Sequence, residues 1–254
     1  MDKLAVISDI HGNRWALEAV LADISARGIT RTVNLGDCLY GPLDPAGTAD
    51  ILIELDLPTV RGNEDRIIND PDGRPDTSQT LEYVRAELSP NHIDWLRNLP
   101  FCLTVTDDCF LCHAGPDRDD GYLLYEVGPD GVTMKSDLRL QEETARIPQP
   151  VILCGHSHVP GLMLLPDGKI IIDAGSVGLQ AYTDDRPYRH RMQAGSPEAR
   201  YTIITGLGDK RQVETIRVAY HHETAAAAAE KNGRHDWATW LRTGTAENPD
   251  YQGE

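Results

Sequence analysis

The sequence is poor in features that would place it in a special structural class. Its 254 residues include two phenylalanines, four methionines and five cysteines, while 40% of the residues are hydrophobic, as in an ordinary globular protein. An odd cysteine count argues against a disulfide framework, and a chain of this length can bury a core without cross-links. The longest apolar runs are far shorter than the roughly 18 residues of a membrane span. The N-terminus has no signal-peptide pattern, so we expect a cytoplasmic protein with no membrane partner.

Positive charge is also scarce. The sequence has 24 lysines and arginines against 40 aspartates and glutamates, which gives a formal net charge of −16. A protein that binds long nucleic acid needs clustered cations to neutralise phosphates, and here the cations are outnumbered and scattered. The composition therefore argues against long nucleic acid as a partner.

Short apolar runs recur along the chain, and each ends in a small or polar residue. They are residues 4–7, 32–35, 58–60, 109–112 and 151–154. Such runs are typical of strands buried on both faces. The segments between the first three have helical period, so the opening predicts a β-α-β-α-β unit with a parallel sheet. Strand patterns dominate from residue 101 onward, with expected hairpins across residues 106–108, 166–168 and 206–209, and these predict a second, mixed sheet.

Two further regions have helical signals. An insertion of about 65–100 contains expected helices near 78–88 and 90–98, and an alanine-rich run opens a C-terminal helical tail of about 223–242. Trp237, Trp240 and Leu241 recur at helical spacing in this tail. We expect this stripe to pack against the domain, with a dimer face as the alternative, so a homo-oligomer stays open. With no linker or break in composition, a single domain over residues 1–254 is expected.

Cys109 and Cys112 form a CxxC sequence within one of the apolar runs. At strand periodicity, residues i and i+3 point to opposite faces of a sheet. There is no second CxxC, so a packing role is favoured over a redox or zinc site.

Five polar clusters directly follow apolar runs. They are Asp9-Ile10-His11, Gly36-Asp37, Gly62-Asn63-Glu64-Asp65, His113-Ala114-Gly115-Pro116 and Gly155-His156-Ser157-His158. Residues at the carboxyl ends of strands in an α/β sheet converge on one crevice, so these clusters are expected to meet. Two aspartates, one asparagine and four histidines supply the oxygen and nitrogen ligands that divalent transition metals accept. Seven ligands exceed the need of one ion, whereas two ions that share a carboxylate would use them all.

These clusters, in this order, resemble the motifs of the calcineurin-like metallophosphoesterase superfamily: DxH, GD, GN, a lone His and GHxH. The resemblance runs from residue 3 to about 219 and is to the small bacterial, phosphodiesterase-like members. It implies a four-layer α-β-β-α sandwich of two facing mixed sheets. It also implies two divalent metal ions (Mn, Fe, Zn, Ni or Co). One ion would be held by Asp9, His11, Asp37 and His158, and the other by Asp37, Asn63, His113 and His156, with Asp37 bridging.

The resemblance further implies a hydrolase with a small phosphorylated substrate, such as a phosphodiester or a nucleotide phosphoanhydride. A phosphomonoester phosphatase is the alternative enzyme. A non-catalytic metal-binding scaffold on the same fold is the alternative outside enzymes, and a nuclease is weakened by the acidic charge. Neither the substrate nor the identity of the metal follows from the sequence.

One motif position departs from the family. The residue after the motif asparagine is usually His, a proton donor to the leaving group, and here it is Glu64. A glutamate is ionised at neutral pH unless its surroundings raise its pKa. Three hypotheses follow: Glu64 has a raised pKa and acts as the catalytic acid, or the leaving group is good enough to need no acid, or the protein binds phosphate without turnover. We favour the second.

Two other segments have open roles. Asp173 stands where relatives often have Asn, and we expect it to cap a turn. Residues 179–200 are polar and basic, and they form either a phosphate-contacting lid or a solvated loop.

Overall fold

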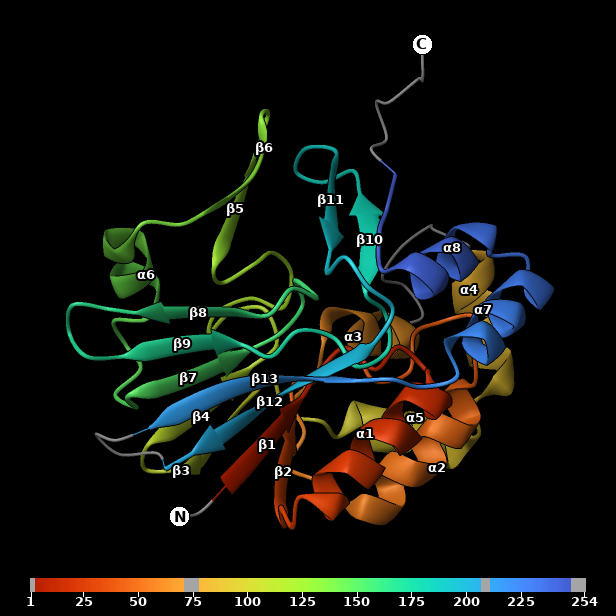
Figure 1. Cartoon of the computed structure of the whole chain (residues 1–254), viewed down its shortest axis with the longest axis horizontal. Coiled ribbons are helices and arrows are strands. Elements are labelled where there is room, and N and C mark those ends of the chain that lie inside the picture. The colour runs from red at the N-terminus through yellow and green to blue at the C-terminus, as the bar shows by residue number, and fades with distance from the viewer. Residues whose placement is uncertain (1–2, 71–77, 207–210, 248–254) are drawn as a thin grey trace.

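The computed structural model describes residues 3–70, 78–206 and 211–247. Over these residues, two facing mixed sheets form the centre of the molecule, with helices outside them (Figure 1). This is the four-layer α/β arrangement expected from the sequence. No helix in these ranges is long and apolar enough to cross a membrane.

The first sheet has four strands in the order β13-β12-β1-β2. Strand β1 runs parallel to β2 and antiparallel to β12, which itself forms a hairpin with β13. The bounds are β1 (Lys3–Ile7), β2 (Arg31–Asn34), β12 (Ala199–Thr205) and β13 (Gln212–Val218). The expected hairpin near residues 201–219 is thus confirmed in its strands, while its turn at 207–210 lies outside the described residues.

The second sheet has five strands in the order β3-β4-β7-β9-β8. Its central pairs β4-β7 and β7-β9 are parallel, and its outer pairs β3-β4 and β8-β9 are the two other hairpins expected from the sequence. The bounds are β3 (Cys102–Thr106), β4 (Cys109–Cys112), β7 (Val151–Cys154), β8 (Gly161–Leu164) and β9 (Ile170–Asp173).

The alternation of side chains along each strand separates the layers of the core. In β1, Leu4 and Val6 lie between the two sheets, whereas Ala5 and Ile7 pack beneath the helices. In β4, Cys109 belongs to the core between the sheets and Cys112 to the core on the far side of the second sheet. Both thiols are buried and unpaired, and burial raises the pKa of each, which supports their packing role.

The first two helices begin at residues suited to cap them. Asn13 and Asp44 cap α1 and α2 through their side chains, and a proline follows Asp44 at the first helical position. Helices α1, α2 and α5 lie together beside the first sheet, and α6 lies beyond the second (Figure 1). The bounds are α1 (Arg14–Ala26), α2 (Pro45–Leu55), α3 (Asn63–Asn69), α4 (Gln79–Glu87), α5 (Pro90–Arg97), α6 (Asp137–Glu143), α7 (His222–Lys231) and α8 (His235–Thr243).

The C-terminal stripe packs within the chain. Trp237, Trp240 and Leu241 are at most 9% exposed and form a core with the alanines of α7. Packing against the domain, the favoured interpretation, is therefore confirmed. The single-domain boundaries and the oligomeric state stay predictions.

One expected strand is wrong. Residues 58–60 make a single bridge to Asn34, with Asn34 N–H donating to Pro58 O and Val60 N–H donating to Asn34 O. Pro58 has no N–H to extend a ladder, and α3 begins at Asn63, so no strand can grow there. Two short hairpins, β5 (Tyr125–Gly128) with β6 (Gly131–Met134) and β10 (Ala181–Asp184) with β11 (His190–Gln193), and helix α6 were not predicted.

Candidate active site

The predicted ligands lie in loops that follow strands, as the sequence indicated. Asp9 and His11 follow β1, Asp37 follows β2, and Asn63 opens α3. His113 follows β4, and the pair His156 and His158 follows β7. The loops of each sheet are bonded to one another, with the N–H of His11 donating to Asp37 O at 3.0 Å and that of Gly155 donating to His113 O at 2.8 Å. A bond between the two sheets joins these loops, because the His156 N–H donates to Asp9 Oδ2 at 3.0 Å. Both sheets therefore contribute to one site.

The backbone at these positions is unusual. Six described non-glycine residues have a positive φ, and five of them are predicted ligands. They are Asp9, His11, Asp37, His156 and His158, with φ between 51° and 68°. This region costs free energy for residues other than glycine, and such strain concentrates at functional sites. The sixth, Asp56, ends helix α2.

One group of donor atoms is formed by Asp9, His11 and His158. The Nε2 atoms of the two histidines lie 3.0 Å apart, and Asp9 Oδ1 lies 3.4 Å from His158 Nε2. His11 Nδ1 donates to Tyr40 O at 2.9 Å, which leaves Nε2 of the neutral ring as the free lone pair. All three side chains are buried, and their donor atoms lie within 4.8 Å of one another.

A second group contains Asp37, Asn63, His113 and His156. His113 Nε2 lies 3.2 Å from Asp37 Oδ2, 3.1 Å from Asn63 Oδ1 and 3.2 Å from His156 Nδ1. His113 Nδ1 donates to Leu35 O at 2.7 Å, so its Nε2 also faces the group as an acceptor when the ring is neutral.

Asp37 connects the two groups. Its carboxylate belongs to the second group and also lies within 4.8 Å of ligand atoms of His11 and Glu64. The Glu64 N–H donates to Asp37 Oδ1 at 2.9 Å and fixes its orientation. Asp37 thus lies in contact with both groups of donor atoms.

The buried carboxylates of the site favour positively charged groups beside them, as the pKa values of the histidines show. Burial alone would lower the pKa of His11, but the carboxylates of Glu64, Asp37 and Asp9 raise it to about 9. In the same way, Asp37 outweighs burial and raises the pKa of His113 to about 10. Burial lowers the pKa of His156 to about 3, and the neighbouring charge of His113 lowers it further in the same direction. Clustered carboxylates favour cations, whether protons or metal ions.

One buried oxygen, Asp9 Oδ1, fits a metal better than the protein alone. Asp9 Oδ1 and His158 Nδ1 have no hydrogen-bond partner among the described residues. A buried polar atom without a partner is costly, and a cation held by Asp9 Oδ1 and the two nearby imidazoles would satisfy that oxygen. The donor set therefore fits divalent metal ions.

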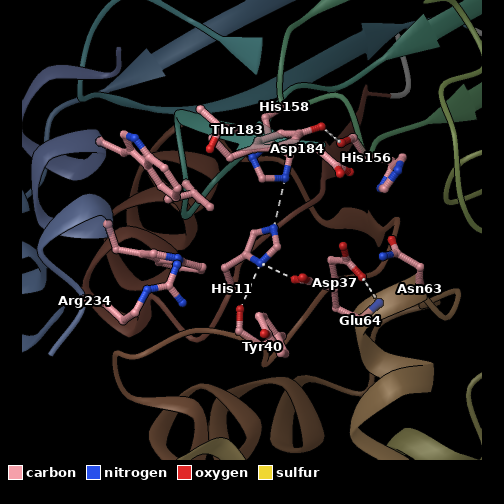
Figure 2. Close-up of a pocket in the computed structure, with 14 residues that line it drawn as sticks. His11, Asp37, Tyr40, Asn63, Glu64, His156, His158, Thr183, Asp184 and Arg234 are labelled. Atoms are coloured by element: carbon pink, nitrogen blue, oxygen red, sulfur yellow. Dashed lines mark hydrogen bonds and ion pairs between the residues drawn. The ribbon is translucent and has the colours of Figure 1, made fainter. Parts of the chain in front are cut away.

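Glu64 lies at the edge of the two groups. Its side chain is 25% exposed, and Oε2 lies 3.2 Å from His11 Nδ1. Burial raises the pKa of Glu64 to about 7, with the hydrogen bond from His11 opposing the rise. The glutamate points into the same pocket as the predicted ligands (Figure 2).

A pocket of 240 Å³ opens over the site. On one side it is lined by six of the predicted residues: His11, Asp37, Asn63, Glu64, His156 and His158. The lining also includes Tyr182, Arg234, Trp237 and Trp240. Tyr182 belongs to the segment 179–200, whose role the sequence left open, and its hydroxyl donates to His156 O at 3.0 Å. Trp237 and Trp240 belong to an apolar stripe that packing alone explains, and Arg234 is in none of the sequence motifs, so only the tertiary structure brings these three to the pocket. Arg234 faces the ligands across the pocket (Figure 2).

The two open segments now have structural roles. Asp173 is buried and caps a turn: its carboxylate accepts from Gly175 N–H at 3.0 Å and from the Ser157 hydroxyl at 2.7 Å. In residues 179–200, Tyr182, Thr183 and Asp184 line the pocket, while Arg186 and Arg189 are exposed outside its lining. For Arg186 and Arg189 the structure thus favours the solvated loop over the phosphate-contacting lid.

Comparison with known families identifies the fold. Residues 3–190 match the calcineurin-like phosphoesterase superfamily domain, and the chain belongs to this family. It is 27% identical to uncharacterized protein MJ0912 of Methanocaldococcus jannaschii, over 92% of this chain and 94% of that protein.

Solved structures show the same architecture. A metallophosphoesterase from Sphaerobacter thermophilus has a TM-score of 0.75 and 23% identity, over 96% of this chain and 100% of that one. Hypothetical protein PH1004 from Pyrococcus horikoshii OT3 also has a TM-score of 0.75, with 18% identity over 97% of this chain and 100% of that one. A putative diadenosine tetraphosphatase has a TM-score of 0.53 and 18% identity, covering 85% of this chain and 93% of that one.

Proposed function

We propose that this protein is a binuclear-metal-dependent phosphoesterase that hydrolyses small phosphodiesters or nucleotide phosphoanhydrides. The observation that carries this proposal is the pair of buried donor groups that meet at Asp37, with Asp9 Oδ1 left without a partner. Membership of the phosphoesterase family supports hydrolysis as the reaction class.

The ligand roles follow from the two groups. Asp9, His11, Asp37 and His158 would hold one ion, and Asp37, Asn63, His113 and His156 the other. When bound, two divalent ions would lower the pKa of a water and withdraw charge from the phosphoryl oxygens. Mn, Fe, Zn, Ni and Co all suit this donor set.

The surrounding residues orient these ligands. Tyr40 O and Leu35 O accept from the Nδ1 atoms of His11 and His113 and fix both rings. The Glu64 N–H fixes Asp37. The Glu64 carboxylate makes an ion-pair contact of 3.2 Å with His11 Nδ1, whose hydrogen already donates to Tyr40 O, so the carboxylate lies against this ring at the pocket edge. This favours substrates whose leaving groups need little protonation.

The substrate range is proposed on the same basis. Phosphoanhydrides and aryl diesters carry good leaving groups, and the name of the putative diadenosine tetraphosphatase with this fold is in line with an anhydride. A phosphomonoester phosphatase stays the alternative enzyme.

The test compares the Mn²⁺-dependent hydrolysis of a nitrophenyl phosphodiester with that of the matching monoester. The leaving group is the same, so the comparison reports the substrate class. We expect faster turnover of the diester, and loss of most activity in Asp37→Ala because both ions lose their shared ligand. Near-normal turnover in Asp37→Ala would overturn the proposed centre. Faster turnover of the monoester would favour the phosphatase, and bound metal without turnover of either ester would favour a scaffold.

A further inference from the structure

The second wall of the pocket comes from a part of the chain outside the family match. Helices α7 and α8 follow residue 190, where the matched domain ends. Arg234, in the turn between them, and Trp237 and Trp240 of α8 line the pocket together with the predicted ligands. This helical pair, which lies after the matched domain, thus reaches the active site.

The turn that carries Arg234 is firmly held. Gly233 adopts a φ of +77° and ends α7, and the Arg234 N–H closes the turn by donating to Ala229 O at 2.9 Å. Asn232 Nδ2 donates to Pro42 O at 3.0 Å, and Gln79 Nε2 donates to Asn232 O at 3.3 Å. The position of Arg234 is therefore set before a ligand arrives.

The guanidinium of Arg234 is oriented by hydrogen bonds that occupy only some of its donors. Its Nε and Nη2 donate to the Asp236 carboxylate at 2.9 and 2.7 Å, and its Nη1 donates to Thr80 Oγ1. These bonds use three of the five N–H donors of an arginine. Its central carbon lies 5.5 Å from the centre of the Trp237 ring, which packs against it. Two donors remain for an anion.

The distances place this cation beside the ligand groups. The Trp237 ring lies 5.9 Å from the ring of His11, so the same indole touches both Arg234 and a predicted ligand. Arg234 is the one arginine or lysine among the described residues that line the pocket. Trp237, Trp240 and Leu179 give the wall around it an apolar character. A cation set in an apolar wall suits a ligand with both an anionic and an organic part.

We propose that Arg234 binds a second phosphate, adjacent to the scissile one, and that Trp237 and Trp240 bound the space for an organic group. The ligand class is then a nucleoside phosphoanhydride, rather than a diester with a single phosphate. This inference rests on the proposed function and narrows its substrate range. Arg234 is a specificity-determining residue in this account, and the chemical step is assigned to the opposite wall.

Equilibrium binding tests the proposal independently of turnover. Isothermal calorimetry measures the Kd of the Mn²⁺-loaded protein for the methylene-bridged analogue of adenosine diphosphate and for adenosine monophosphate. Wild type, Arg234→Gln and Arg242→Gln are compared. Arg242 is the matched control, because it lies on α8, directly after the turn that carries Arg234, and pairs with Glu223 and Glu230 of α7, outside the pocket lining.

We expect Arg234→Gln to weaken binding of the diphosphate about 10- to 100-fold, since it removes a charge-assisted hydrogen bond. Its affinity for the monophosphate should change less than threefold, and Arg242→Gln should change neither. An equal loss for both nucleotides, or no loss for either, would overturn the proposal. So would a wild-type protein that does not prefer the diphosphate. The analogue is not cleaved, so this binding experiment does not depend on turnover. A lack of nitrophenyl ester hydrolysis would count against the proposed function, whereas a lack of preference for the diphosphate analogue counts against this inference alone.

Discussion

The replacement Gly62→Ala tests how closely the loops of the site approach one another. A Cβ added to Gly62 would lie 2.7 Å from Asp37 Cγ, and closer still to Asp37 Oδ1 and the Asp37 backbone N. Ordinary van der Waals contact begins at 3.4 Å, so the carboxylate that joins the two donor groups must move by at least about 0.7 Å. A shift of this size in a positioned catalytic group is expected to lower turnover by at least about tenfold.

The same replacement should affect stability. Overpacking of a tight contact costs about 1–3 kcal/mol, which lowers Tm by about 2–4 °C for each kcal/mol in a chain of this size. Gly115→Ala is the matched control, because Gly115 lies two residues after His113 but its added Cβ would have no neighbour closer than 3.7 Å. Nitrophenyl diester hydrolysis and thermal unfolding are measured on both variants. Gly62→Ala with wild-type turnover and Tm would refute this account of the site.

Two further predictions concern Glu64 and Asp173. Glu64→His restores the residue usual in the family, so the hydrolysis of an alkyl phosphodiester, a poor leaving group, should rise about tenfold or more while the nitrophenyl diester changes less than threefold; equal effects on both esters would contradict it. Burial raises the pKa of Asp173 well above its usual range. The folded state therefore keeps a proton that the unfolded chain loses near pH 4, and wild-type stability falls as pH rises from there toward the raised pKa. Asp173→Asn should remove this fall and gain stability over wild type in urea unfolding between pH 4 and 8, whereas parallel pH curves would count against it.

The sequence predicted which polar side chains gather at one site, because its signals are local. Each ligand directly follows an apolar run, and the carboxyl ends of strands share one edge of a sheet. The hairpins of the second sheet were equally readable, since Pro166-Asp167-Gly168 and its counterparts mark turns without reference to the rest of the fold. The order of the motifs then predicted which of these side chains gather in each of the two donor groups.

The remaining features depend on tertiary contacts that local patterns do not encode. Residues 58–60 have the composition of a strand, but the segment starts at Pro58 and α3 begins at Asn63. It therefore makes a single β-bridge, to Asn34. The Trp237 side chain packs in the C-terminal core and also lines the pocket. Its place in the apolar stripe predicts only the packing, so the sequence could not reveal its place in the pocket lining. Arg234 reaches the site through a turn fixed by contacts to residues about 150 and 190 positions earlier.

The central claim is that two divalent ions, held by the donor groups that meet at Asp37, make the protein a phosphoesterase. The most direct test adds Mn²⁺ stepwise to the metal-free protein and follows hydrolysis of the nitrophenyl diester as a function of ions added per chain, at protein concentrations above the Kd. The account predicts no turnover without metal and a rate that reaches its plateau at two ions per chain. Full turnover in the metal-free protein, or a plateau at one ion, would contradict it.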